Sequence, residues 1–170
     1  MSDYVKPYID KIEDFARSKN VTIELLLIGG LAMSFYGMPR HTVDIDAEIR
    51  CNDDIYFELI EFLKEENISS NISGNISGWG IVPLPADYRK RAGLVHETAN
   101  LLIKTLDPVD FIFSKLMRGT EDDFTDAIEV IRKYAITKDA LVEREKLIQF
   151  PKDPETLFFK KKFEHLIELI

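Results

Sequence analysis

Leu27-Ile28-Gly29-Gly30, followed fourteen residues after its last glycine by Asp44-Ile45-Asp46, is the part of the sequence that decides the fold. Residues 22–28 are mostly hydrophobic and predict a strand that ends at the glycine pair. Residues 31–36 predict a short apolar helix, and residues 43–49 predict a second strand. A strand, a glycine turn, a helix and an acidic strand therefore follow one another.

The second predicted strand separates aliphatic from acidic side chains. Because side chains alternate across a strand, its aliphatic residues share one face, and the other face carries Asp44, Asp46 and Glu48. Neighbouring acids on that face lie about 6.6 Å apart at Cα, which lets two carboxylates share a divalent cation. A solvated strand face is the alternative interpretation. Strands are depleted in aspartate, and this favours a metal site at Asp44 and Asp46.

Two further features near this strand suit phosphate. Arg40 and Thr42 precede it and offer a cation and a hydroxyl to phosphate oxygens. The pair Gly29-Gly30 lets the backbone approach a phosphate at the start of a helix. Taken alone, the pair indicates only a tight turn, and it matches neither the P-loop nor the dinucleotide fingerprint. Glycines and acids together are typical of phosphoryl or nucleotidyl transfer.

Composition narrows the class of protein. The chain has 170 residues, 45% hydrophobic and 31% charged, which is ordinary for a globular protein. It has no apolar run of the ~20 residues that span a bilayer, and its first residues do not resemble a signal peptide. Cys51 is the only cysteine, so we expect a cytoplasmic protein.

The net charge of −8 argues against nonspecific binding to nucleic acid, although a specific RNA substrate stays open. The two basic clusters are more typical of solvated faces than of phosphate tracks; they are residues 89–91 and 160–162.

The remaining pattern predicts an α+β fold, a small mixed sheet flanked by helices, with an all-helical C-terminal part. We expect an α/β core with an N-terminal helix at residues 1–106 and a helical part at residues 107–170. Residues 67–80 favour a polar-capped helix or a loop, running into a short strand near residues 78–82. Other predicted helices cover residues 3–19, 52–66, 107–118, 120–134, 137–148 and 155–170, and other strands cover residues 93–96 and 100–106.

A third group of polar residues lies in the helix that begins at Asp107-Pro108. Asp110 and Lys115 stand five residues apart and Arg118 follows, and five residues turn a helix by about 140°. Asp110 and Lys115 therefore do not lie one above the other. A helix-capping acid and a solvated lysine are the alternatives to a functional role.

Taken in order, these features resemble the nucleotidyltransferase superfamily with its polymerase-beta-like fold. The chain is most similar to the group related to the AbiEii toxins of type IV toxin–antitoxin systems. Four motifs carry the resemblance: the glycine turn at Gly29-Gly30-Leu31, Asp44-Ile45-Asp46, the Asp110 to Lys115 segment, and a lone aspartate in the next helix. That aspartate is Asp126, with Asp123 as the competing candidate.

The resemblance implies a Mg²⁺-dependent or Mn²⁺-dependent enzyme that moves a nucleoside monophosphate from an NTP to an acceptor hydroxyl. Asp44 and Asp46 would hold the metal, and the implied catalytic residues are Asp44, Asp46 and Lys115. The implied nucleotide-binding residues are Gly29, Gly30, Arg40, Thr42, Asp110, Lys115, Arg118 and Asp126. The acceptor stays open among tRNA, a protein and a small molecule, and an antitoxin-like protein is an expected partner.

One departure keeps a second hypothesis open. Many members of the superfamily place a third catalytic carboxylate on a later strand, and the candidates here are Glu48, Asp87 and Glu97, none in an obvious frame. A degenerate nucleotide-binding or interaction module of the same fold is therefore the alternative. A D-x-D phosphatase or glycosyltransferase ranks last, because Glu48 stands where the phosphatase pattern has threonine.

Overall fold

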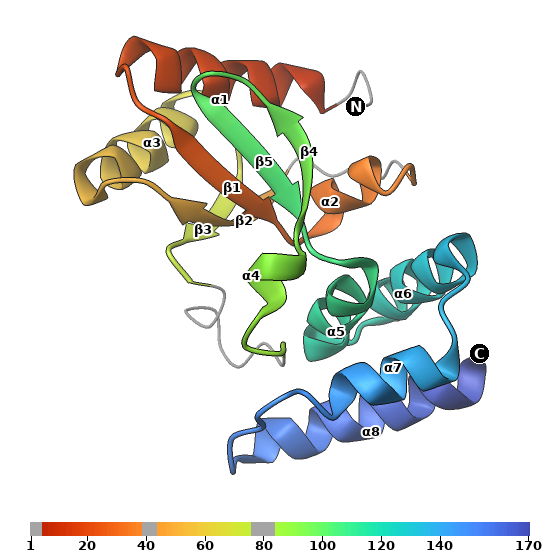
Figure 1. The fold of residues 1–170 in the computed structure, drawn as a ribbon. Helices are drawn as coiled ribbons and strands as arrows, with labels where there is room; N and C mark the ends of the chain where they lie inside the picture. Colours follow the sequence, from red (N-terminus) through yellow and green to blue (C-terminus); the bar gives the residue numbers. More distant parts are fainter. Residues whose placement is uncertain (1–4, 39–43, 76–83) are drawn as a thin grey trace. The chain divides into compact units, whose positions relative to one another are not determined.

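The computed structural model describes residues 5–38, 44–75 and 84–170, and the chain divides into two compact units (Figure 1). The first unit comprises residues 1–76 and 93–105, and the second comprises residues 77–92 and 106–170. The sequence placed residues 84–92 with the sheet, but they belong to the helical unit. A physical reason is that Arg91 forms an ion pair with Asp110 in that unit.

Within the described residues, five strands of the first unit form one mixed sheet in the order β3-β2-β1-β5-β4. The central strand β1 pairs antiparallel with β2 and parallel with β5. At the edges, β3 runs parallel to β2, and β4 runs antiparallel to β5. This arrangement confirms the predicted α+β class. The strands are β1 (Ile23–Leu27), β2 (Ile45–Arg50), β3 (Ser70–Ser73), β4 (Gly93–Glu97) and β5 (Leu101–Thr105).

The two faces of this sheet differ in chemistry. On one face Leu25 lies between Ile49 of β2 and Ile103 of β5, and all three side chains are buried. Helices α1 (Lys6–Ser18) and α3 (Asp53–Glu65) pack beside each other on the sheet. The opposite face is mixed: Leu26 of β1 is buried there, and Lys104 of β5 donates to Glu24 of β1 at 2.7 Å. The acids of β2 share this mixed face by alternation.

Strand β3 corrects the prediction of a polar-capped helix or a loop over residues 67–80. Residues 70–73 pair with β2, so that Ser70 lies opposite Ile45 and Ile72 opposite Ala47. Ile72 is buried, and its carbonyl accepts a hydrogen bond from the hydroxyl of Tyr56. The strand forms because a distant partner supplies its backbone hydrogen bonds. The strand predicted near residues 78–82 lies outside the described residues.

Helices of the second unit begin and end where local signals place them. Asp107 caps the helix after it, since its side chain accepts from the Val109 N–H at 3.0 Å. Thr120 and Asp123 form a capping box at the start of the next helix. Aromatic packing joins the helix that follows Asp107 to the last helix of the chain, because the rings of Phe113 and Phe163 meet edge-on with centroids 5.6 Å apart. The helices are α4 (Tyr88–Arg91), α5 (Pro108–Arg118), α6 (Glu121–Tyr134), α7 (Lys138–Glu145) and α8 (Pro154–Leu169).

Over the residues that the structure describes, none of the helices combines the length and the apolar character needed to cross a membrane.

The end of α5 generates a prediction about Gly119. This residue has φ of +63°, and a Cβ atom on it would lie 2.5 Å from Cδ of Lys162. The ammonium group of Lys162 donates to the carbonyls of Met117 and Arg118 at 2.8 Å. We expect Gly119→Ala to lower the free energy of unfolding by about 1–2 kcal/mol, because it adds a left-handed alanine and displaces that lysine.

Urea denaturation measures this loss, and Gly93→Ala is the control because a Cβ atom there meets nothing within 4 Å. Equal stability of Gly119→Ala and wild type would show that Lys162 does not hold this helix end.

Candidate functional site

The glycine turn and the acidic strand lie side by side in the first unit. Strand β1 leads into Gly29, the residue that precedes helix α2 (Gly30–Phe35). The Ile28 N–H donates to the Asp46 carbonyl at 3.0 Å, which continues the β1–β2 pairing by one residue. Asp46 therefore lies beside Gly29, and the antiparallel register of two strands brings the two motifs together.

Space, rather than backbone conformation, requires glycine at residue 29. Its φ of −79° is accessible to any residue. A Cβ atom on Gly29 would lie 1.8 Å from Oδ2 of Asp46 and 2.7 Å from Cβ of Asp46. The Asp46 carboxylate thus occupies the place where a side chain at residue 29 would be.

The two carboxylates of this site suit a hard cation that also binds waters and substrate phosphates. Asp44 is exposed just before β2, and Asp46 is half-buried on the strand. Among the described residues, no three His, Cys, Asp or Glu side chains come together as a metal-holding group. Mg²⁺ commonly binds to one or two carboxylates and completes its shell with waters and substrate phosphates. Asp44 and Asp46 fit this pattern as the two protein ligands of the cation.

The structure separates the three candidates for a third catalytic acid. Glu48 lies on β2 opposite Leu26 and is 3% exposed. Glu97 is exposed at the end of the edge strand β4. Asp87 lies in the second unit and pairs with Arg91. Neither Glu48 nor Glu97 joins the two aspartates in a group of three metal donors within the described chain.

Two of the predicted phosphate-binding residues, Arg40 and Thr42, lie outside the described residues.

Asp110 occupies the centre of an ion-pair network in the second unit. Its carboxylate is fully buried, with Arg91 of α4 at 2.9 Å and Arg144 of α7 at 2.8 Å on opposite oxygens. Arg144 also donates to the capping residue Asp107 at 3.1 Å. Burial raises the pKa of Asp110 against the opposing effect of the two guanidinium groups. A direct contact between Asp110 and a nucleotide stays a prediction, and in this structure both oxygens accept from arginines.

Lys115 belongs to a second network, between α5 and α6. Its ammonium nitrogen lies 2.6 Å from Asp126, 3.5 Å from Asp123 and 5.5 Å from the ring centre of Phe111. All three charged side chains are buried. The structure therefore brings together the predicted lysine, the predicted motif-four aspartate and its competitor.

Arg118 completes this second network at its exposed end. Nε and Nη2 of Arg118 each lie 2.7 Å from an oxygen of Asp123. Burial acts to raise the pKa of Asp123, but hydrogen bonds from Arg118 and Thr120 outweigh it and hold that pKa at about 2. Asp123 is thus the charged anchor of the network.

The two arginines that pair with Asp110 were missed by sequence reasoning. Arg91 belongs to the basic cluster that the sequence assigned to a solvated face, yet it points inward to a buried carboxylate. Arg144 lies 34 residues from Asp110, and no spacing rule connects them. The one local signal was the spacing of four between Asp87, the residue before α4, and Arg91 at its end, where the structure has an ion pair.

A family model described as "Nucleotidyltransferase of unknown function (DUF6036)" matches residues 8–165. The chain belongs to this family. Membership confirms the predicted nucleotidyltransferase superfamily, and the match runs through both units of this nucleotidyltransferase family member. A comparison with curated proteins finds no match.

The contact between Gly29 and Asp46 generates a prediction for the first unit of this family member. We expect Gly29→Ala to lower the free energy of unfolding by about 1–3 kcal/mol, because Asp46 must move to admit the methyl group. Gly74→Ala is the matched control, since a Cβ atom there meets nothing within 4 Å. Thermal and urea unfolding measure both. Wild-type stability of Gly29→Ala would contradict the close approach of Asp46.

The pKa of Asp123 generates a prediction about pH. Its folded value of about 2 lies below the value of about 3.9 for an unfolded aspartate, so its stabilising contribution is present above pH 4. That contribution is lost as the pH falls from 4 towards 2. We expect Asp123→Asn to cost about 2 kcal/mol at pH 6, and we expect the difference from wild type to shrink below pH 4.

Urea unfolding at several pH values measures this difference. Asp122→Asn is the control, since it removes an exposed acid from the same first turn of α6. A difference that is independent of pH would show that the Asp123 charge contributes nothing to stability.

Proposed function

We propose that this chain is a Mg²⁺-dependent nucleotidyltransferase of the kind related to the AbiEii toxins. It transfers a nucleoside monophosphate from an NTP to an acceptor hydroxyl. The observation that supports this most is the packing of the Asp46 carboxylate against Gly29. This packing brings an acid that we propose as a metal ligand next to the glycine turn, where we propose that the triphosphate binds.

Each residue of this site has a defined role in the proposed reaction. Asp44 and Asp46 hold the cation, which supplies Lewis-acid polarisation and neutralises phosphate charge. Gly29 and Gly30 are the proposed triphosphate-binding residues of the turn. The acceptor oxygen forms a bond to the α-phosphorus as the bond to pyrophosphate breaks, and the hydroxyl proton passes to solvent. Such a site works by positioning and electrostatic stabilisation, and Mn²⁺ meets the same oxygen donors.

In this proposal Lys115 and Arg118 keep the phosphate-binding role that the resemblance implies. The Lys115 ammonium lies within 2.6 Å of Asp126, so Asp126 and Asp123 hold it in one position. Asp110 acts in the same proposal by fixing α4, α5 and α7 to each other through its two arginines. Arg40 and Thr42 are proposed phosphate ligands from the sequence alone.

The proposed location, acceptor and protein partner follow from the resemblance to the AbiEii-related group. We propose a cytoplasmic protein with an acceptor that is a tRNA, a protein or a small molecule, and with an antitoxin-like protein partner. The net charge of −8 fits an acceptor recognised by shape and specific contacts rather than by a broad basic surface.

Metal-dependent nucleotide binding tests the proposal directly. Calorimetric titration of a non-hydrolysable ATP analogue with Mg²⁺ is expected to show binding to wild type and none to Asp44→Asn/Asp46→Asn. Asp53→Asn/Asp54→Asn is the matched control, because it removes two exposed acids from the same unit and is expected to bind as wild type does. Unchanged binding by the first variant contradicts the proposal. So does a wild type that binds none of the four nucleotides.

The two-acid site also supports a second candidate, a module of the same fold that binds a nucleotide without turnover. Two observations on the described residues favour it: no third acid joins Asp44 and Asp46, and Lys115 is buried in an ion pair. Transfer from a labelled NTP distinguishes the two candidates. Turnover that Asp46→Asn abolishes would exclude the module.

A further inference from the structure

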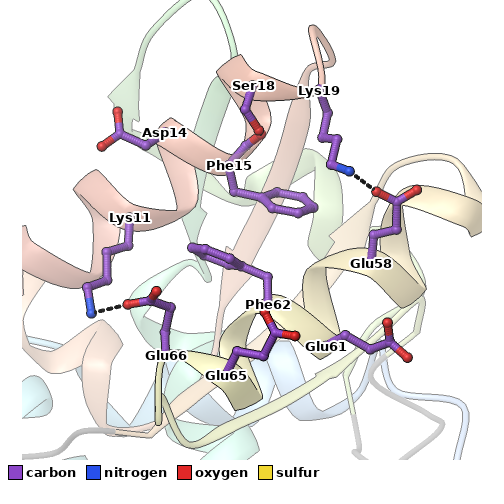
Figure 2. Close-up of a pocket in the computed structure, with 10 residues that line it drawn as sticks. All are labelled: Lys11, Asp14, Phe15, Ser18, Lys19, Glu58, Glu61, Phe62, Glu65 and Glu66. Atoms are coloured by element: carbon purple, nitrogen blue, oxygen red, sulfur yellow. Dashed lines mark hydrogen bonds and ion pairs between the residues drawn. The ribbon is translucent and has the colours of Figure 1, made fainter.

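A groove on the first unit runs between α1 and α3 and encloses about 580 Å³ (Figure 2). The rings of Phe15 and Phe62 face each other across its middle, with centroids 5.1 Å apart. Helices α1 and α3, with the residue that follows each helix (Lys19 and Glu66), supply its lining, which includes two lysines and five carboxylates. The groove is therefore acidic, with aromatic carbon between its charged walls.

Both lysines of this acidic groove already have partners. Lys11 pairs with Glu66 at 2.7 Å, and Lys19 pairs with Glu58, as the dashed lines in Figure 2 show. Glu61 and Glu65 are exposed one turn apart on α3, and neither has an ion-pair partner within the described part of the chain. Two like charges at this spacing repel each other, so a cationic partner would relieve them.

Apolar surface continues from the same side of α3. Phe57 stands one turn before Glu61 on the helix and is 65% exposed. An exposed phenylalanine beside unpaired carboxylates is a combination that suits a partner with both apolar and cationic side chains.

The second unit carries a patch of the opposite kind, at the start of α8. Leu157 and Phe158 are 58% and 59% exposed, and Lys160 and Lys161 follow them, also exposed. These four side chains are exposed because the packing of Phe159 against Phe113 fixes which side of α8 faces inward. We call Leu157, Phe158, Lys160 and Lys161 the basic patch.

We propose that copies of this chain associate head to tail, with the basic patch of one copy docked on the acidic groove of the next. The lysines of the patch meet Glu61 and Glu65, and Leu157 and Phe158 cover the apolar surface of Phe57 and Phe62. Charges of opposite sign steer the encounter and fix its register, and the apolar contact supplies the lasting part of the affinity. Since the two surfaces differ, the contact closes into a ring or extends as a chain.

The mass of the full chain in solution tests this proposal. Sedimentation is expected to show species above the 19.6 kDa of one chain, and their share is expected to rise with protein concentration and fall as NaCl is added. We expect Glu61→Lys/Glu65→Lys and Lys160→Glu/Lys161→Glu, each measured alone, to sediment as monomers. Circular dichroism checks that both remain folded.

An equimolar mixture of these two variants is the decisive sample. Each variant has one reversed and one native surface, so every contact between unlike variants is again complementary, and association is expected to return. Glu97→Lys/Glu129→Lys reverses two exposed acids elsewhere and is expected to associate as wild type does. A monomeric wild type, a reversed variant that still associates, or a monomeric mixture would each overturn the proposal.

Discussion

The Asp46 carboxylate fills the space that any side chain at residue 29 would need, and the rest of the site depends on this contact. It exists because β1 and β2 run antiparallel in a register that puts Leu27 opposite Ala47. One residue further, the last strand hydrogen bond joins Ile28 to Asp46. The glycine turn and the acidic pair thus lie side by side at one end of the β1–β2 pairing.

This constraint changes what the first glycine of the pair means. A glycine turn before a helix suggests a backbone conformation that other residues avoid, but Gly29 adopts an ordinary φ of −79°. What is special is the absence of a side chain next to a carboxylate. Glycine at residue 29 is therefore required by the protein's own acid.

Charge is organised differently in the second unit. Asp110 and Lys115 point to different neighbours, as their spacing on a helix requires, and each is buried with partners of opposite sign. Burying such groups has a high desolvation cost, so these pairs are better understood as devices that fix geometry than as sources of stability. Through them α5 holds α4 and α7 on one side and α6 on another.

Local signals made much of the second unit predictable. The predicted helices over residues 107–118 and 120–134 begin and end through a few neighbouring residues, and the structure confirms both, with caps at Asp107 and Thr120 and a helix end at Gly119. Strand β3 could not be predicted, because Ser70–Ser73 gains its hydrogen bonds from β2, more than twenty residues away in the chain. The pairing of Arg91 and Arg144 with Asp110 was hidden for the same reason.

In the site itself, alternation along β2 predicted which acids share a face, but not that Glu48 would be buried. The reason for glycine at residue 29 emerges only once the register of β1 and β2 is known.

Nuclear magnetic resonance with Mn²⁺ and a non-hydrolysable nucleotide tests the central claim most directly. Paramagnetic Mn²⁺ broadens the signals of nearby amides and so reports where the metal–nucleotide complex sits. We expect broadening of the Gly29, Gly30 and Asp46 amides in wild type, and we expect it to be lost in Asp44→Asn/Asp46→Asn. Broadening that spares these amides, or that persists in the variant, would contradict that claim.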